Sequence, residues 1–220
     1  MKKLVIFGAG AIAELAYFYF KHDSNYDVVA FTVDKSYIQT PQFCNLPLVA
    51  FEEIIDRYPP SQYSMFIAIS YVQLNTLRTE KYLVAKKNGY KIASYISSKA
   101  TTWTGLVTGE NCFILENNVI QPFVKIGNNV TLWSGNHIGH HATIEDNCFI
   151  SSHVVVSGGV TIKENCFIGV NATLRDHIII AKNNILSASA LILKNTVENG
   201  VYMGSPAKLA KVPSNRLKKI

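Results

Sequence analysis

The chain has 220 residues, a length that allows one large domain or two small ones. Its net charge of +6 is modest and no nucleic-acid-binding motif accompanies it, so we expect no nucleic-acid partner. No apolar stretch reaches membrane-spanning length, and Leu4–Phe7 is too short for a signal peptide. We therefore expect a cytoplasmic protein without a membrane span.

The first hundred residues alternate between strand and helix patterns. Lys3–Phe7 reads as a buried strand, and a glycine-containing turn leads from it into an apolar-periodic helix that runs to about Lys21. Further strands are expected at Asp27–Val33, Met65–Ile69 and Lys91–Ile96. A second helix is expected at Val72–Lys87. This alternation predicts a small Rossmann-like α/β domain over residues 1–100, with a parallel sheet covered by helices on both faces.

Ligands of such sheets bind at the carboxyl ends of the strands. The substrate-binding candidates follow the first three major strands: Gly8, Ala9, Gly10 and Ala11, then Asp34 and Lys35, then Ser70 and Tyr71. A phosphate could approach the helix N-terminus over the glycine turn. We interpret the turn as the docking point of a nucleotide-diphosphate sugar. NAD binding, for which Ala13 replaces the third glycine, and a purely structural turn are the alternatives.

From residue 114 to residue 192, every sixth residue is Ile, Leu or Val. A period of six belongs neither to a helix nor to a simple alternating strand. Asparagines recur every eighteen residues, at Asn111, Asn129, Asn147, Asn165 and Asn183. Eighteen is three sixes, and Asn tolerates the left-handed backbone of a sharp corner. The pattern therefore predicts a solenoid over residues 101–220, with a C-terminal tail, in which three short strands make one coil.

The side chains expected inside the solenoid are the aliphatic series and the small or apolar residue two positions before each of its members. Three cysteines, Cys112, Cys148 and Cys166, share that second position. We interpret them as buried small hydrophobes rather than as disulfide or metal ligands.

Four histidines lie close together in one expected coil: His137, His140, His141 and His153. The eighteen-residue repeat places Gly158 over His140. Because Gly158 has no side chain, a ligand could lie against its backbone N–H. Such a pair suits acyl transfer, since the imidazole takes a proton from the attacking group and the N–H stabilises the developing oxyanion. The alternative for His140 is a structural or subunit-contact role, and His137, His153 and His177 are expected at corners or interfaces.

The chain resembles the bacterial hexapeptide-repeat sugar acyltransferases related to sialic acid O-acetyltransferase and to nucleotide-aminosugar N-acetyltransferases. The matching segments are Phe7-Gly8-Ala9-Gly10, Ile138-Gly139-His140-His141, Ser157-Gly158-Gly159-Val160, Phe167-Ile168-Gly169-Val170 and Gly204-Ser205-Pro206-Ala207-Lys208. The resemblance covers essentially the whole chain. It implies that the solenoid is a left-handed parallel β-helix and that the protein is a homotrimer with active sites between subunits.

The resemblance also implies roles for single residues. It makes His140 the general base and Gly158 the contact to the thioester carbonyl of acetyl-CoA. Val170 and Ala188 then line the coenzyme A groove between subunits, and the segment that ends in Lys208 lies near the adenosine end.

Two positions depart from the family pattern. The family usually has Asp or Glu directly after the base, where this chain has His141, and often a second histidine where this chain has Phe149. We keep His141 among the catalytic residues and Phe149 among the coenzyme-binding ones. Glu145 and Asp146 are alternatives for orienting His140.

The function implied is acetyl-CoA-dependent N-acetylation of a nucleotide-linked amino-deoxy sugar, without a metal, in the biosynthesis of a bacterial surface polysaccharide such as lipopolysaccharide O-antigen. O-acetylation of a sugar hydroxyl would use the same residues. Two other classes stay open: a zinc site built from the clustered histidines, and a non-catalytic scaffold or sugar-nucleotide sensor. The basic residues near the end are a solvated tail or a patch for coenzyme A: Lys208, Lys211, Arg216, Lys218 and Lys219.

Overall fold

The computed structural model describes residues 1–217 and divides into two compact units. The first comprises Met1–Ser70 and Leu77–Tyr95, and the second comprises Tyr71–Thr76 and the chain from Ile96 onward. The division precedes the expected one at residue 100, because the Ser97 N–H already donates to the carbonyl of Ile114 in the solenoid. Lys218 and Lys219 of the predicted basic tail lie outside the described residues. Among those described, no helix is long and apolar enough to cross a bilayer.

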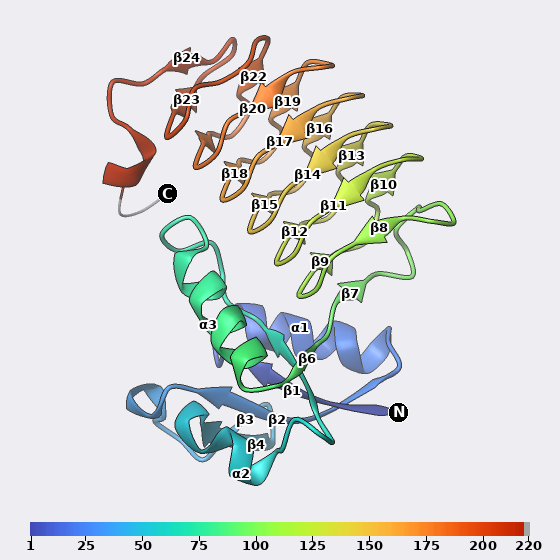
Figure 1. The fold of residues 1–220 in the computed structure, drawn as a ribbon, viewed down its shortest axis with the longest axis vertical. Coiled ribbons are helices and arrows are strands. Elements are labelled where there is room, and N and C mark those ends of the chain that lie inside the picture. Colours follow the sequence, from blue (N-terminus) through green and yellow to red (C-terminus); the bar gives the residue numbers. More distant parts are fainter. Residues whose placement is uncertain (218–220) are drawn as a thin grey trace. The chain divides into compact units, whose positions relative to one another are not determined.

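A six-stranded sheet forms the centre of the first unit, in the order β3-β4-β2-β1-β5-β6 (Figure 1). The strands are β1 (Lys2–Phe7), β2 (Tyr26–Val33), β3 (Gln42–Phe43), β4 (Leu46–Ala50), β5 (Ser64–Ile67) and β6 (Lys91–Ile92). Neighbouring strands are parallel, except in the β3–β4 hairpin. The helices are α1 (Ala11–His22), α2 (Ile54–Arg57) and α3 (Thr76–Lys87), with 3-10 turns at Lys35–Tyr37 and Phe51–Glu53. Strand β1 lies between β2 and β5. The chain therefore adds β2, β4 and β3 on one side of β1 and then adds β5 and β6 on the other side.

Burial explains why these segments form a layered sheet. Leu4, Val5 and Ile6 of β1 are fully buried, as expected of a parallel strand covered on both faces. Helix α1 buries one stripe, Ala13, Ala16 and Phe20, at the spacing of an amphipathic helix.

The segment before α3 differs from the prediction of a helix beginning at Val72. Gln73, Leu74 and Asn75 have φ angles of 52°, 52° and 63°, which a right-handed helix cannot include. The helix therefore begins only at Thr76. The expected strand at Lys91–Ile96 is likewise interrupted, and forms β6 and β7 (Tyr95–Ile96).

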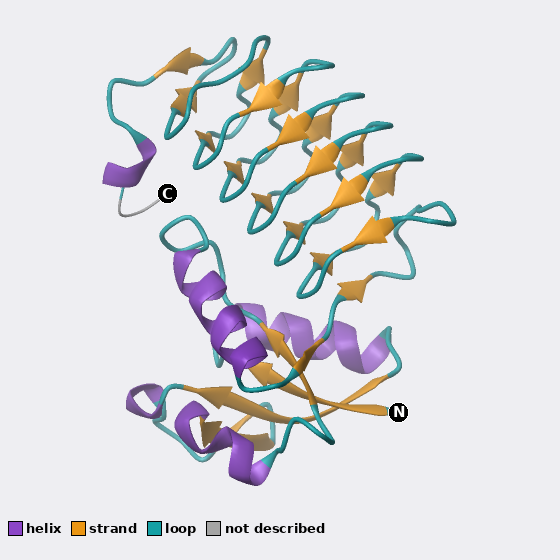
Figure 2. Ribbon diagram, viewed as in Figure 1, coloured by secondary structure: helices purple, strands orange, loops and turns teal. Residues whose placement is uncertain are grey.

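Short parallel strands stack into three sheets in the second unit (Figures 1 and 2). The first sheet has the order β10-β13-β16-β19-β22 and the second β20-β17-β14-β11-β8. The third has the order β24-β23-β21-β18-β15-β12-β9-β7, in which the β23–β24 pair is antiparallel. From β8 to β22, paired residues are eighteen apart, as in His137↔Val155 and Ile138↔Val156. The predicted coil of three strands is confirmed.

The strands of the solenoid have these bounds: β8 (Val107–Thr108), β9 (Phe113–Ile114), β10 (Val119–Ile120), β11 (Lys125–Ile126), β12 (Thr131–Leu132), β13 (His137–Ile138), β14 (Thr143–Ile144), β15 (Phe149–Ile150), β16 (Val155–Val156), β17 (Thr161–Ile162), β18 (Phe167–Ile168), β19 (Thr173–Leu174), β20 (Ile179–Ile180), β21 (Ile185–Leu186), β22 (Leu191–Ile192), β23 (Val201–Met203) and β24 (Lys208–Leu209). A 3-10 turn at Ser214–Arg216 follows.

The core of the solenoid consists of the residues that the period of six predicts. Every member of the series from Ile114 to Ile192 is at most 3% exposed. Cys112, Cys148 and Cys166 are fully buried and free of disulfides, as expected. Burial raises the pKa of the Cys148 thiol well above its usual value, and its Sγ donates to the Lys163 carbonyl.

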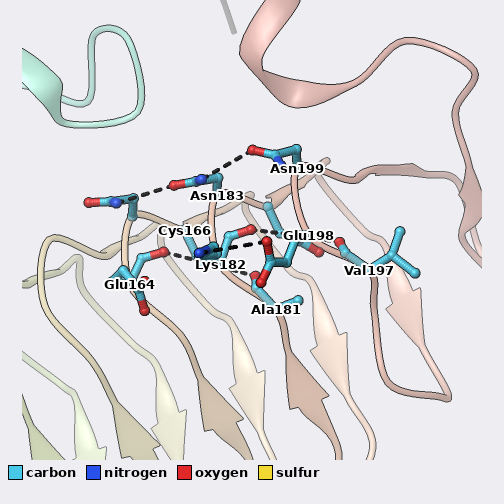
Figure 3. A network of polar contacts seen from close by, with 10 residues as sticks. Glu164, Cys166, Ala181, Lys182, Asn183, Val197, Glu198 and Asn199 are labelled. Carbon is cyan, nitrogen blue, oxygen red and sulfur yellow. Dashed lines mark hydrogen bonds and ion pairs between the residues drawn. The ribbon is translucent and has the colours of Figure 1, made fainter.

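The corners of the coils repeat as regularly as the core. A positive φ recurs at every sixth position from Asn111 to Ser189, and from Asn117 onward each of these positions lies three residues after an inward aliphatic residue. Most of these positions are Asn, Gly or His, as the left-handed conformation favours. At one corner the asparagine side chains form a ladder: Asn111 donates to Asn129, Asn129 to Asn147, Asn165 to Asn183, and Asn183 to Asn199. Figure 3 shows the end of this ladder at Asn183 and Asn199.

Candidate active site and nucleotide pocket

The His140 imidazole lies directly against the backbone of Gly158, one coil further along the solenoid. A Cβ at Gly158 would stand 2.7 Å from His140 Cε1 and 2.8 Å from Nε2, so a side chain there would displace the ring. The coils are joined by the Gly159 N–H, which donates to the His140 carbonyl at 2.9 Å. Within residues 1–217 the Gly158 N–H donates to no acceptor. The structure thus leaves a backbone donor beside an exposed imidazole.

The second nitrogen of His140 faces His141. The two Nδ1 atoms are 3.1 Å apart, and the ring centroids are 5.3 Å apart at 85°. His141 has φ 59°, so it occupies one of the left-handed corner positions. The coil before contributes Gln121, whose Oε1 accepts the His140 N–H at 2.8 Å, and Phe123, whose ring lies 4.7 Å from that of His141.

Neither carboxylate considered as an orienting group contacts His140. Asp146 Oδ1 accepts the Asn128 N–H at 2.7 Å, and Glu145 pairs with Lys163 Nζ at 2.6 Å. The hydrogen bond to Glu145 raises the pKa of Lys163. Both carboxylates belong to the next corner of the same coil. Of the three residues considered for orienting His140, only His141 is in contact with its ring.

The hollow beside those carboxylates has a volume of about 540 Å³. Its lining includes Glu145, Asp146 and Glu164, with Lys125 as the one basic side chain. Three carboxylates would repel the phosphates of a coenzyme. We therefore do not place the coenzyme here.

Three further residues expected to bind the coenzyme, Val170, Ala188 and Lys208, lie at other parts of the solenoid than His140. Val170 and Ala188 are exposed at the corner after β18 and β21, whereas His140 and Gly158 lie at the corner after β13 and β16. The exposed Lys208 belongs to the terminal β23–β24 hairpin.

Phe149 points to a role different from coenzyme binding. It is 4% exposed and lies 5.7 Å from the Phe167 ring and 4.7 Å from that of Tyr71. Within one chain the ring is therefore a core contact, and its assignment to the coenzyme stays a prediction.

Two of the other histidines lie at corners. His153 and His177 have φ angles of 59° and 54°, and each imidazole lies over a glycine of the coil before, Gly135 and Gly159 respectively. His137 lies in β13. Among residues 1–217, no three His, Cys, Asp or Glu side chains are grouped so that they could hold a metal ion.

A second hollow, of about 360 Å³, opens at the carboxyl ends of β1, β2 and β5 in the first unit. Six of the eight substrate-binding candidates line it: Gly8, Ala9, Gly10, Ala11, Asp34 and Ser70. A Cβ at Gly8 would lie 2.7 Å from the Ala68 carbonyl oxygen, and Gly8 has φ +133°. Only glycine fits there, and the chain turns directly into α1, whose first N–H groups have no capping side chain.

Two predicted residues lie elsewhere. Lys35 extends to Glu53, 3.2 Å away, and is largely exposed. Tyr71 belongs to the second unit, where its ring packs on Phe149 and Phe167. Neither residue lines the hollow, and their assignment to the substrate stays a prediction.

One charged residue of this hollow, Lys81, was not predicted from the sequence. Lys81 of α3 lines it, with Nζ 2.8 Å from Asp34 Oδ1 and 5.7 Å from the centre of the Phe7 ring. Its side chain is only 13% exposed. No local signal marks it in the sequence, because α3 contains several lysines and only the fold selects this one.

Comparison with known proteins supports the repeat. Residues 105–139 and 124–158 match the family described as bacterial transferase hexapeptide (six repeats). No curated protein matches the chain in sequence. Residues 105–158 thus carry the hexapeptide repeat, and the repeats and parallel sheets fit a left-handed β-helix preceded by an α/β region.

Solved structures share this fold along nearly the whole chain. A variant of perosamine N-acetyltransferase from Caulobacter crescentus, in complex with CoA and GDP-perosamine, has a TM-score of 0.85 at 20% identity, over 96% of this chain and 98% of the other. The acetyltransferase domain of PglB from Neisseria gonorrhoeae, with acetyl coenzyme A, has a TM-score of 0.82 at 21% identity, over 95% and 99%. WeeI from Acinetobacter baumannii has a TM-score of 0.74 at 17% identity, over 96% of this chain and 100% of the other. At these identities the likeness establishes a common fold.

Proposed function

We propose that the protein transfers an acetyl group from acetyl-CoA to the amino group of a nucleotide-linked amino-deoxy sugar. The observation that carries the proposal is the exposed His140 imidazole against the unused N–H of Gly158. The fold supports it, since the similar structures include an N-acetyltransferase in complex with CoA and GDP-perosamine.

The roles of the residues follow from acyl-transfer chemistry. Acetyl-CoA would supply the acetyl group as a thioester. His140 Nε2 takes a proton from the attacking amine as the new C–N bond forms. The Gly158 N–H stabilises the negative charge that develops on the carbonyl oxygen. The C–S bond then breaks, and the thiol of coenzyme A leaves with the proton.

The hollow of the first unit is proposed as the nucleotide site of a Rossmann-like domain. The order of its parallel strands, β4-β2-β1-β5-β6, changes direction at β1, where doubly wound sheets bind their ligands. The free N–H groups at the start of α1 suit a pyrophosphate, and Lys81 adds a positive charge beside it. Asp34 can accept hydrogen bonds from a ribose or a base.

The coenzyme site is proposed to lie between subunits of a homotrimer. Val170 and Ala188 occupy a different corner from His140 and Gly158, so a coenzyme that touches both sets requires two chains. Light scattering under assay conditions should give three times the monomer mass of 24.4 kDa; an active monomer would contradict this arrangement. The proposed context is the cytoplasmic synthesis of a bacterial surface polysaccharide such as O-antigen, to which activated amino sugars contribute.

The test is a thiol-release assay with acetyl-CoA and amino-deoxy sugars linked to UDP, dTDP and GDP, GDP-perosamine among them. We expect one nucleotide series to release thiol and to gain an acetyl mass. His140→Ala should lower kcat at least a hundredfold. The matched control is His153→Asn, which exchanges another corner histidine for a residue that tolerates its positive φ.

Two outcomes would contradict the proposal. A His140→Ala variant with full activity would remove His140 as the base. Acetylation that occurs on a sugar hydroxyl instead, located by mass spectrometry of the product, would make the enzyme an O-acetyltransferase.

A further inference from the structure

Phe123 occupies a backbone position that does not suit an aromatic residue. It has φ 67° within the series of left-handed corners, whose other members from Asn111 to Ser189 are Asn, Gly, His and Ser. A bulky residue in this conformation is an outlier. Its side chain is 71% exposed, so little burial offsets the strain. Strain without a packing benefit is characteristic of functional sites.

The surroundings of Phe123 connect it with the proposed base. Its ring lies 4.7 Å from the His141 ring at 37°, and His141 is paired with His140. The same turn carries Gln121, which holds the His140 N–H through Oε1. The Pro122 carbonyl accepts the His141 N–H at 3.3 Å. The turn Gln121–Phe123 is therefore joined to the two histidines by two hydrogen bonds and a ring contact.

The chemistry of this turn suits a sugar. Within residues 1–217, the Gln121 amide nitrogen has no acceptor, so it can donate to a hydroxyl while Oε1 remains on His140. The exposed Phe123 ring offers an apolar surface to the C–H-rich face of a deoxy sugar. Along the solenoid, His140 lies between the coil that carries Gly158 and the coil that carries this turn. The acyl group would lie on the Gly158 side of His140, which leaves the side of the Gln121–Phe123 turn for the acceptor.

We infer that the turn Gln121–Phe123 is the platform on which the acceptor sugar lies, with Phe123 stacked on the sugar ring and Gln121 donating to a hydroxyl. The inference rests on the proposed acetyl transfer and adds the acceptor contacts to it. It accounts for an aromatic residue at a corner where asparagine would be less strained.

The variant that tests the platform is Phe123→Asn, because Asn suits the left-handed corner and removes the ring. We expect the KM for the amino sugar to rise about tenfold, with the KM for acetyl-CoA changed less than twofold. The melting temperature should stay the same or rise, and the light-scattering mass should not change. Phe123→Tyr keeps the ring and should restore the wild-type KM. As a strain control, Asn117→Phe places the ring at another exposed corner, with φ 59°, and should lower the melting temperature.

Calorimetry separates this inference from the proposed function. The probes are GDP and GDP-perosamine, with the corresponding UDP and dTDP pairs, and the quantity is the gain in affinity that the sugar adds to the nucleotide. If the wild type shows this gain but releases no thiol, the proposed transfer fails, and a gain lost in Phe123→Asn would still support the platform. An unchanged gain and an unchanged acceptor KM in Phe123→Asn would overturn it. A wild type in which the sugar adds no affinity to the nucleotide would also overturn it. So would a changed light-scattering mass in Phe123→Asn, because Phe123 would then be an interface residue.

Discussion

The Nδ1 atoms of His140 and His141 lie 3.1 Å apart, so a hydrogen bond between them holds one proton. If His140 donates it, the lone pair of His140 lies on Nε2, the nitrogen beside Gly158. The tautomer that general-base catalysis needs is then set by the neighbouring imidazole. A carboxylate in this place would also stabilise the imidazolium by charge, which His141 does not do while it is neutral. The pair therefore fixes orientation rather than supplying charge.

Replacing His141 should separate these two effects. His141→Asn tolerates the positive φ and presents Oδ1 as an acceptor, so kcat should fall less than about tenfold. His141→Ala removes the acceptor, and kcat should fall about ten- to a hundredfold with little change in the KM for acetyl-CoA. His141→Asp introduces a charge, and comparing its kcat with that of His141→Asn isolates the effect of that charge. Equal activity of the Ala and Asn variants would show that the Nδ1 contact has no part in catalysis.

Gly158→Ala should inactivate the enzyme without unfolding it. The new Cβ would stand 2.7 Å from His140 Cε1, so the imidazole must move and the space beside the N–H is lost. We expect kcat to fall at least a hundredfold, in the range found when an oxyanion donor is removed. Gly105→Asn is the control, because Gly105 also has a positive φ and no atom lies within 4 Å of a Cβ there. An active Gly158→Ala variant would argue against acyl transfer at this corner.

Lys81→Met should weaken nucleotide-sugar binding and leave coenzyme binding intact. The lysine lines the hollow of the first unit beside Asp34, and its loss removes a positive charge and leaves a carboxylate unpaired. The dissociation constant should rise about ten- to a hundredfold, as measured by calorimetry. Lys35→Met is the matched control, since that lysine pairs with Glu53 outside the hollow. Equal losses in both variants would indicate a general effect of net charge.

The sequence allowed the solenoid to be predicted in detail because each of its rules is local. The period of six names the inward residues, and the period of eighteen stacks Gly158 against His140. The first unit was predicted only in outline. Lys81 reaches its pocket from a helix distant in sequence, and Tyr71 leaves the expected helix for a strained turn whose packing only the tertiary structure reveals. Phe123 is the intermediate case: the repeat predicts its corner, but its contact with His141 depends on how the two rings turn, which no repeat specifies.

The stability of the first unit should fall at high pH through Tyr90. Burial raises the pKa of Tyr90 to about 12, and its hydroxyl donates to the Tyr58 carbonyl at 2.7 Å. An unfolded tyrosine loses its proton near pH 10, so between pH 10 and about 12 the unfolded state binds fewer protons and the free energy of unfolding declines. Tyr90→Phe should be less stable than the wild type at pH 7 and should lose stability less steeply above pH 10. Urea unfolding at each pH measures the free energy of unfolding of both proteins. If it declines equally in both above pH 10, Tyr90 is not the cause.

The asparagine ladder offers a way to separate backbone strain from side-chain hydrogen bonding. Asn129 is fully buried with φ 58°, accepts from Asn111 at 2.7 Å and donates to Asn147 at 2.9 Å. Asn129→Gly keeps the left-handed corner and loses both bonds, which should lower the free energy of unfolding by about 2 kcal/mol. Asn129→Ala loses the same bonds and adds the strain of a left-handed Cβ, so it should be about 1 kcal/mol less stable still. Urea unfolding of the three proteins measures both differences. If Gly and Ala are equally destabilising, the ladder alone selects asparagine, and the positive φ at this corner carries no measurable energetic cost.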